Sequence, residues 1–159
     1  MTEQAIFLFY SEGRGVQADD GLNIDVDMRD RYYTSSYGRM IQNLFKLAAL
    51  SENLDFESVA KRSLETKMAE IEEKQDLVPS SAIALLMQEH GIVVLKHKKS
   101  VLAAKRKAII SIRYPYLVTK VKEDTDNFLA CKVDRCFAYD RELAKVAKKI
   151  EGLLPLTNQ

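Results

Sequence analysis

Residues 116–135 read YLVTKVKEDTDNFLACKVDR, and this stretch decides the fold class. Two segments rich in apolar and β-branched residues, 116–122 and 128–135, flank the run 123–127. That run consists of acidic residues, threonine and asparagine, a composition typical of turns. The sequence therefore predicts a β-hairpin in which Lys122 pairs with Phe128 across the turn.

The predicted hairpin has two unlike faces, because successive side chains of a strand point to opposite sides. One face is apolar and is expected to lie in the core: Leu117, Thr119, Val121, Leu129, Cys131 and Val133. The other face mixes lysines with aromatic rings and is expected to face water: Tyr116, Val118, Lys120, Lys122, Phe128, Ala130 and Lys132.

Apolar periodicity predicts the remaining elements. Ser35 or Ser36 is suited to cap the first helix, and Gly91 to follow the third. Helices are expected at about 40–50, 55–75, 82–89 and 141–151, and further strands at 5–10, 22–28, 92–95 and 107–114. We therefore expect an α+β fold, with an antiparallel sheet mostly from the C-terminal half packed with about four helices.

A chain of 159 residues is expected to form a single domain, 1–159, and is long enough to bury a core without metals. We divide it into an acidic N-terminal part, 1–89, a basic segment, 90–122, and a hairpin with a C-terminal helix, 116–152. No apolar run is long enough to span a membrane. Cys131 and Cys136 differ in strand parity, so they are expected to point to opposite faces if the strand continues through both. Two free cysteines fit a reducing, cytoplasmic location.

The formal net charge of +1 hides an uneven distribution. Residues 1–89 have a net charge of −7, and residues 123–159 have a net charge of −1. Residues 90–122 contain nine bases and no acid. Clustered lysine and arginine are the electrostatic signature of a polyanion-binding surface.

We therefore expect a non-enzymatic protein that associates with nucleic acid, either DNA or RNA. The basic segment would contact phosphates, and the aromatic rings of the hairpin would stack on bases. The candidate binding residues are Lys96, Lys98, Lys99, Lys105, Arg106, Lys107, Arg113, Tyr116, Lys120, Lys122, Phe128 and Lys132.

A second candidate patch interleaves arginine with tyrosine just before the first predicted helix. Arginine and tyrosine suit phosphate binding at a helix N-terminus, and they are equally enriched in protein interfaces. The alternative is that the tyrosines are half-buried and the arginines pair with nearby aspartates. The patch consists of Arg29, Arg31, Tyr32, Tyr33, Tyr37 and Arg39.

Other functions stay open. One alternative is that the lysines form a solvated sheet face. Another is that the acidic part covers them, either within the chain or between subunits of a homo-oligomer with a structural or regulatory role. Asp25 and Asp27 on one strand face, with Lys46 or Lys67, suggest a metal-dependent nuclease. No residue pattern calls for a resident metal or cofactor. The helix order resembles that of winged-helix DNA binders, but the acidic second helix disfavours contact with DNA.

Overall fold

A computed structural model describes residues 10–11, 15–16, 28–74 and 76–154. The chain forms two compact units. The first takes the described residues up to 47 together with 54–89, and the second takes 48–53 together with the described residues from 90 onward. The single-domain expectation stays a prediction. The strands expected at 5–10 and 22–28 lie almost wholly outside the described residues.

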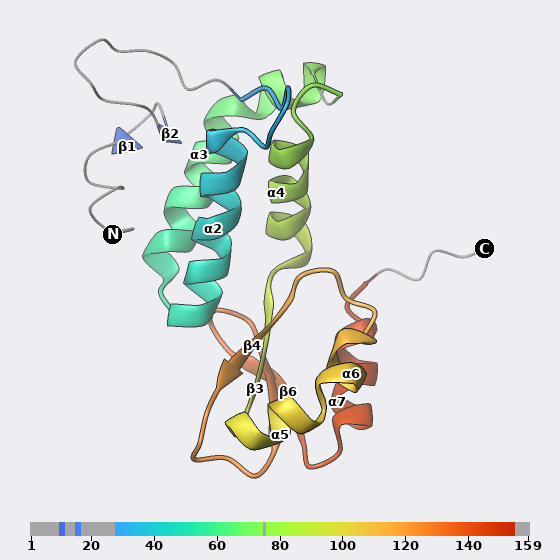
Figure 1. Ribbon diagram of the computed structural model, residues 1–159. Helices are drawn as coiled ribbons and strands as arrows, with labels where there is room; N and C mark the ends of the chain where they lie inside the picture. The colour runs from blue at the N-terminus through green and yellow to red at the C-terminus, as the bar shows by residue number, and fades with distance from the viewer. Residues whose placement is uncertain (1–9, 12–14, 17–27, 75, 155–159) are drawn as a thin grey trace. The chain divides into compact units, whose positions relative to one another are not determined.

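The helices of the first unit confirm the predicted periodicity. The stripe expected on the second helix is realised, since Ala60, Leu64 and Ile71 are buried. Outside the helices, β1 and β2 form a two-stranded antiparallel pair. The elements of this unit are β1 (Tyr10–Ser11), β2 (Gly15–Val16), α2 (Ser36–Ser51, whose last turn belongs to the second unit), α3 (Leu54–Glu73) and α4 (Pro79–His90) (Figure 1).

One aspartate connects the N-terminal ends of α2 and α4. The carboxylate of Asp30 accepts the backbone N–H of Ser35 at 2.6 Å and that of Ser80 at 2.7 Å. The hydroxyl of Ser35 accepts the N–H of Gly38 at 3.1 Å, which makes Ser35 the N-cap that the sequence predicts. Free N–H groups at both helix ends are thereby satisfied.

The second unit contains a four-stranded mixed sheet with the order β4-β3-β5-β6. β3 pairs with β4 in parallel and with β5 in antiparallel fashion, and β5 pairs with β6 in antiparallel fashion. The overall α+β class is confirmed, and the sheet is mostly antiparallel. Its strands are β3 (Val93–His97), β4 (Leu117–Val121), β5 (Phe128–Cys131) and β6 (Cys136–Asp140).

The predicted hairpin between 116–122 and 128–135 is wrong. β3 lies between the two segments, and β5 instead turns back onto β6. Local turn chemistry favours a hairpin, but here the longer-range pairing of the fully buried strand β3 with both segments prevails. The acidic run 123–127 therefore connects two strands that are not neighbours.

The strand predicted at 107–114 is also wrong, because part of this segment is helical. Ile109 and Ile112 are buried at helical spacing, whereas Ile110, which strand parity would bury, is 72% exposed. Parallel strands need a crossover connection, and two short helices supply it between β3 and β4. They are α5 (Lys99–Ala104) and α6 (Arg106–Ile110).

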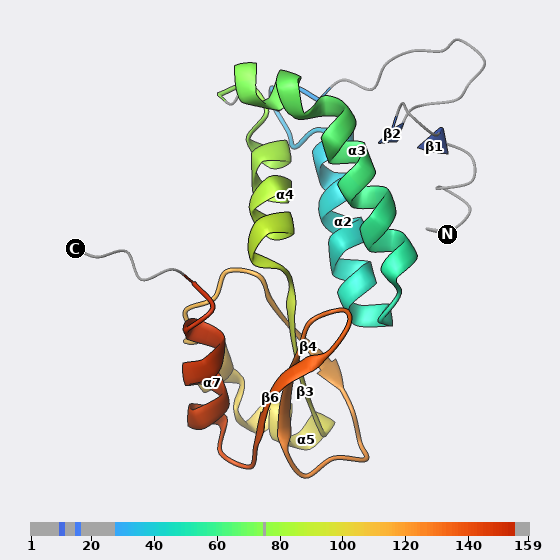
Figure 2. The ribbon, with the colours of Figure 1, turned by 180° about the vertical axis from the view of Figure 1, so that it is seen from behind.

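The core of the second unit lies on one face of the sheet. Val93 and Leu95 of β3 meet Ile109 of α6 and Val146 of the C-terminal helix, α7 (Leu143–Glu151). Figures 1 and 2 show α7 against this side of the sheet. Phe128 and Ala130, expected on the wet face, belong to this core. The sequence therefore predicts the wrong buried face for β5 as well as the wrong partner strand.

Cys131 and Cys136 form a disulfide between β5 and β6. The predicted opposite orientation is wrong, because the chain turns back between them and a β-bulge at Ala130 and Cys131 shifts the register. The pairing removes the free thiols from which a reducing compartment was inferred. Among the described helices, none has the length and apolarity needed to cross a membrane.

Candidate nucleic-acid interface

The nine bases of residues 90–122 divide into two groups according to their surroundings. Four of them form ion pairs with carboxylates: Lys96, Lys98, Lys120 and Lys122. The other five are exposed, and within the described part of the chain their side chains have no carboxylate partner: Lys99, Lys105, Arg106, Lys107 and Arg113.

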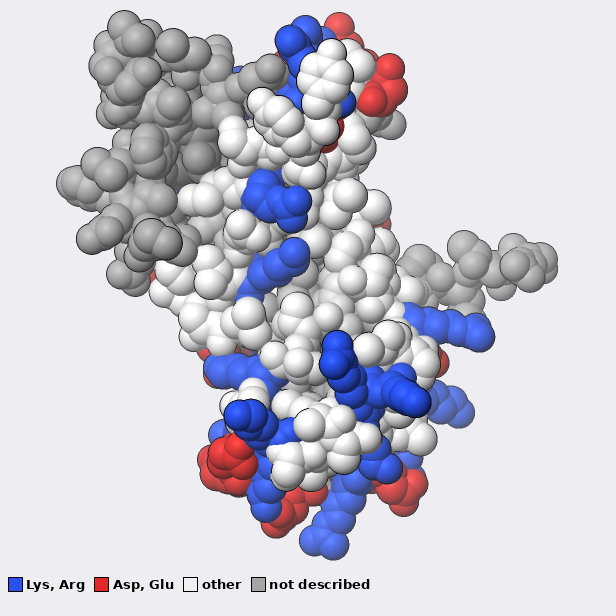
Figure 3. Space-filling model, in the orientation of Figure 1, with Lys and Arg blue, Asp and Glu red and all other residues white. Residues whose placement is uncertain are grey.

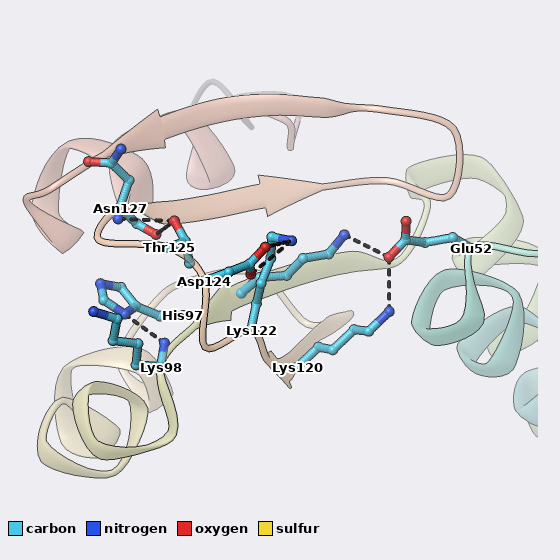
Figure 4. A network of polar contacts seen from close by, with 9 residues as sticks. Glu52, His97, Lys98, Lys120, Lys122, Asp124, Thr125 and Asn127 are labelled. Carbon is cyan, nitrogen blue, oxygen red and sulfur yellow. Dashed lines mark hydrogen bonds and ion pairs between the residues drawn. The ribbon is translucent and has the colours of Figure 1, made fainter.

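Glu52 neutralises two lysines on neighbouring strands. Lys96 and Lys120 are directly opposite each other in the parallel register of β3 and β4. Like charges in this position repel, and Lys96 is only 6% exposed. One carboxylate oxygen of Glu52 lies 2.9 Å from the Nζ of each lysine (Figure 4). An acid from the N-terminal part thus covers two residues of the predicted binding surface.

The backbone holds Glu52 in an unusual conformation. Its φ of 59° is in the left-handed region, which favours glycine, and it directly follows α2. The N–H of Asn53 donates to the carbonyl of Ala48 at 3.1 Å, the hydrogen bond that closes a helix end of this kind. Hydrogen bonds from Lys120 and Lys96 lower the pKa of the Glu52 carboxyl to about 2.

The acidic run 123–127 neutralises two further bases. The Nζ of Lys98 lies 2.6 Å from Asp126, and the Nζ of Lys122 lies 3.1 Å from Asp124. The hydrogen bond that Lys98 donates to Asp126 raises the pKa of Lys98. Figure 4 shows Lys122 beside Asp124 at the start of the connection to β5. These two lysines are exposed in part, but a neighbouring acid already offsets their charge.

The five unpaired bases are concentrated on and beside the crossover helices. Four of them fall within residues 99–107, which form α5 and the start of α6, and Arg113 follows α6. Figure 3 shows blue side chains gathered over this part of the molecule. The backbone N–H of Lys99 donates to the carboxylate of Glu123 at 3.2 Å, and the side chain of Lys99 is exposed.

The aromatic residues expected to stack on bases are engaged elsewhere. Phe128 is 2% exposed and contacts the edge of the His97 ring. Tyr116 is half-buried and packs against Tyr114. Lys132 donates to the carbonyl of His90 at 3.1 Å. The predicted face of lysines and aromatic rings is therefore absent from the described sheet, because its members lie on different faces of strands that do not pair.

The arginine–tyrosine patch of the first unit is also divided. Tyr32 and Tyr33 are exposed, at 97% and 82%. Tyr37 is buried and donates its hydroxyl to the carbonyl of Ser63 at 2.6 Å, so it serves packing. Arg39 donates to the hydroxyl of Thr34 at 3.4 Å, and Arg29 and Arg31 each have an interaction partner.

The described residues do not test the metal-dependent nuclease. Asp25 and Asp27 lie outside the described residues. Among the residues that the structure does describe, no group of three potential ligands could hold a metal ion. Lys67, one of the two proposed positive groups, lies 3.8 Å from Glu70 on the same helix. The nuclease therefore stays a prediction without a described site.

Sequence reasoning missed the two features that organise this surface. In the sequence, Glu52 is an ordinary polar residue after the first helix. Only the folded structure shows that it lies beside β3 and β4 and contacts a lysine on each. The sequence analysis assigns no element to residues 99–104, so it places none of the exposed bases on helices. The only signal in the sequence was the absence of acids from 90–122.

Comparisons with known proteins do not extend this description. No family model, no curated protein and no solved structure matches the chain.

Proposed function

We propose that the protein binds nucleic acid through the exposed bases of α5 and α6. The supporting observation is the contrast among the nine bases of one acid-free segment. The bases on the sheet strands or directly after them each pair with a carboxylate, whereas the five bases from Lys99 to Arg113, on and beside the crossover helices, do not. Unpaired cations gathered on one side of a structure attract polyanions and release their counterions on binding.

The proposed contacts are with the phosphate backbone. Lysine and arginine on exposed helices position a protein on nucleic acid but do not by themselves read a sequence. The sheet aromatics are buried or half-buried, so base stacking is not part of the proposal. We therefore expect binding that depends strongly on salt and weakly on sequence.

Covering of the basic segment by a neighbouring subunit is a less supported alternative. The carboxylates that neutralise Lys96, Lys98, Lys120 and Lys122 all belong to the same chain. No second copy is needed to satisfy these charges. Self-association through other surfaces stays a prediction, as does a cytoplasmic location.

A salt titration tests the proposal. Affinity for a fluorescent oligonucleotide, single- or double-stranded, is measured by anisotropy at several salt concentrations. The slope of log K against log salt is about −0.9 for each duplex phosphate neutralised, so Lys99→Gln/Lys107→Gln should reduce its magnitude by roughly 2. Absence of binding to any oligonucleotide at low salt would overturn the proposal.

The matched control is Lys98→Gln/Lys122→Gln. It removes the same number of charges from lysines that already pair with Asp126 and Asp124. Its salt slope should stay close to that of the unmodified protein. Equal effects of the two double variants would mean that only overall charge matters, and that the crossover helices are not the binding surface.

A further inference from the structure

A pocket of about 580 Å³ lies between α6 and α7 in the second unit. Its volume is within the range of roughly 300–1,000 Å³ that accommodates small-molecule ligands. Apolar side chains contribute to its lining, including Ile112, Phe128 and Leu143. Because it is built within one unit from two helices and a strand, its walls are fixed by the core.

The two ends of the pocket differ in charge. Lys105 precedes α6 and Arg141 lies just before α7, and both line the pocket. Glu151, the last residue of α7, also lines it and accepts the N–H of Arg113 at 2.9 Å. Since Arg113 follows α6, the C-terminal ends of the two helices meet there, away from the two cations.

The two cations that line the pocket form no ion pairs within the described part of the chain. Among the residues that the structure describes, neither Lys105 nor Arg141 forms an ion pair; Arg141 has only a weaker electrostatic interaction with Asp126, whose carboxylate already pairs with Lys98. One acid, Glu142, also lines the pocket, but its carboxylate lies 3.0 Å from the Nζ of Lys145. An arginine and a lysine that form no ion pair suit a phosphate group, which arginine can bind with two parallel hydrogen bonds.

We propose that this pocket binds a nucleoside monophosphate with an amino-bearing base. The phosphate would contact Lys105 and Arg141. The base would lie against the apolar side chains of Ile112 and Leu143, and its exocyclic amino group would donate to Glu151. Carboxylates accept hydrogen bonds from the amino group of cytosine in this way.

The pocket goes beyond the proposed function, because a free nucleotide can occupy it whether or not α5 and α6 bind a polymer. The same chemistry is also present at the phosphorylated end of a nucleic-acid strand. An oligonucleotide with a 5′-phosphate, compared with one without it, distinguishes these two sources. Preference for the phosphorylated strand indicates a strand end, and equal binding indicates the free nucleotide.

Calorimetry with cytidine monophosphate, uridine monophosphate and inorganic phosphate tests the pocket. We expect cytidine monophosphate to bind about tenfold more tightly than uridine monophosphate, because uracil lacks the amino group. We expect Arg141→Gln to weaken binding at least about tenfold. Ala144→Phe, at an exposed pocket residue, should fill the space and abolish nucleotide binding without unfolding the protein.

Lys148→Gln is the control, since it removes one charge from an exposed α7 lysine that does not line the pocket. Its affinity should stay within about twofold of that of the unmodified protein. Inorganic phosphate binding as tightly as the nucleotide, unchanged binding in Ala144→Phe, or no nucleotide binding would each overturn the proposal. If the pocket does not bind a nucleotide, the effect of Lys99→Gln/Lys107→Gln on the salt dependence of oligonucleotide binding is unchanged. The two proposals can therefore be refuted separately.

Discussion

The carboxylate of Glu52 lies 2.9 Å from the ammonium nitrogen of Lys96, whose side chain is almost fully buried. A buried ammonium group without an acid would lose its hydration and gain nothing in return. The same oxygen also contacts Lys120, so one acid stabilises two lysines that would otherwise repel each other. The ion pair is thus part of the fold of the second unit and not free binding capacity.

Glu52→Gln should destabilise the protein by about 2 kcal/mol, because it leaves the buried Lys96 without an opposite charge. Glu52→Gly removes the same charge but relieves the left-handed backbone, which costs a non-glycine residue about 1 kcal/mol. The glycine variant should therefore be the more stable of the two. Urea unfolding measures both, and a glutamine variant as stable as the unmodified protein would contradict the role of this ion pair.

The pH dependence of this contribution follows from the lowered pKa. Hydrogen bonds from Lys120 and Lys96 move the pKa of Glu52 from an ordinary 4.5 to about 2 in the folded chain. The stabilisation is therefore complete above pH 4.5 and is lost as the pH falls toward 2. The stability difference between the unmodified protein and Glu52→Gln should shrink across that window, and a difference that grows on acidification would contradict this assignment.

Asp30→Asn should destabilise the first unit by about 1–2 kcal/mol, in the range of a lost helix cap. Burial raises the pKa of Asp30, but N–H bonds from Ser80 and Ser35 more than offset this, so its pKa lies below the ordinary value. Asp76→Asn, the same change at an exposed acid, is the control. Thermal unfolding of both variants should show a loss only for Asp30→Asn.

Gly38→Ala should destabilise the protein by about 2 kcal/mol or more, because a methyl group there would overlap the side chain of Ser80. Gly152→Ala is the matched control. The nearest atom to a Cβ at Gly152 is 3.4 Å away, an ordinary contact, and its backbone is right-handed. Denaturant midpoints should fall for Gly38→Ala and stay unchanged or rise for Gly152→Ala.

The disulfide should be detectable as the absence of free thiols in the unreduced protein. Since it closes a loop of only five residues, the chain-entropy relation gives it a stabilisation of about 2 kcal/mol. Thiol titration with and without denaturant, followed by unfolding in the presence of a reductant, measures both quantities. Two titratable thiols in the unreduced, unfolded chain would contradict the pairing.

Much of the helical part could be predicted from the sequence. The stripe containing Ala60, Leu64 and Ile71 follows from helical periodicity, and the N-cap at Ser35 follows from hydrogen bonding within one turn. These signals are local, so they survive without knowledge of the rest of the fold.

The sheet could be predicted only as separate segments. The strand positions around Val93, Leu117 and Phe128 were correct, but their pairing was not. Pairing depends on which strand lies in the middle, and that is decided by burial across the whole unit. The error in pairing also reversed the expected face of Phe128, and with it the candidate binding surface.

The central position of β3 has a consequence for synthesis. β3 is the first strand of its sheet to leave the ribosome, and the strands that flank it begin only at Leu117 and Phe128. Until both have emerged, the nascent chain exposes a mostly apolar strand with two unpaired edges, which invites aggregation. The solubility of a newly made chain should therefore depend on rapid completion of translation or on chaperones during this interval.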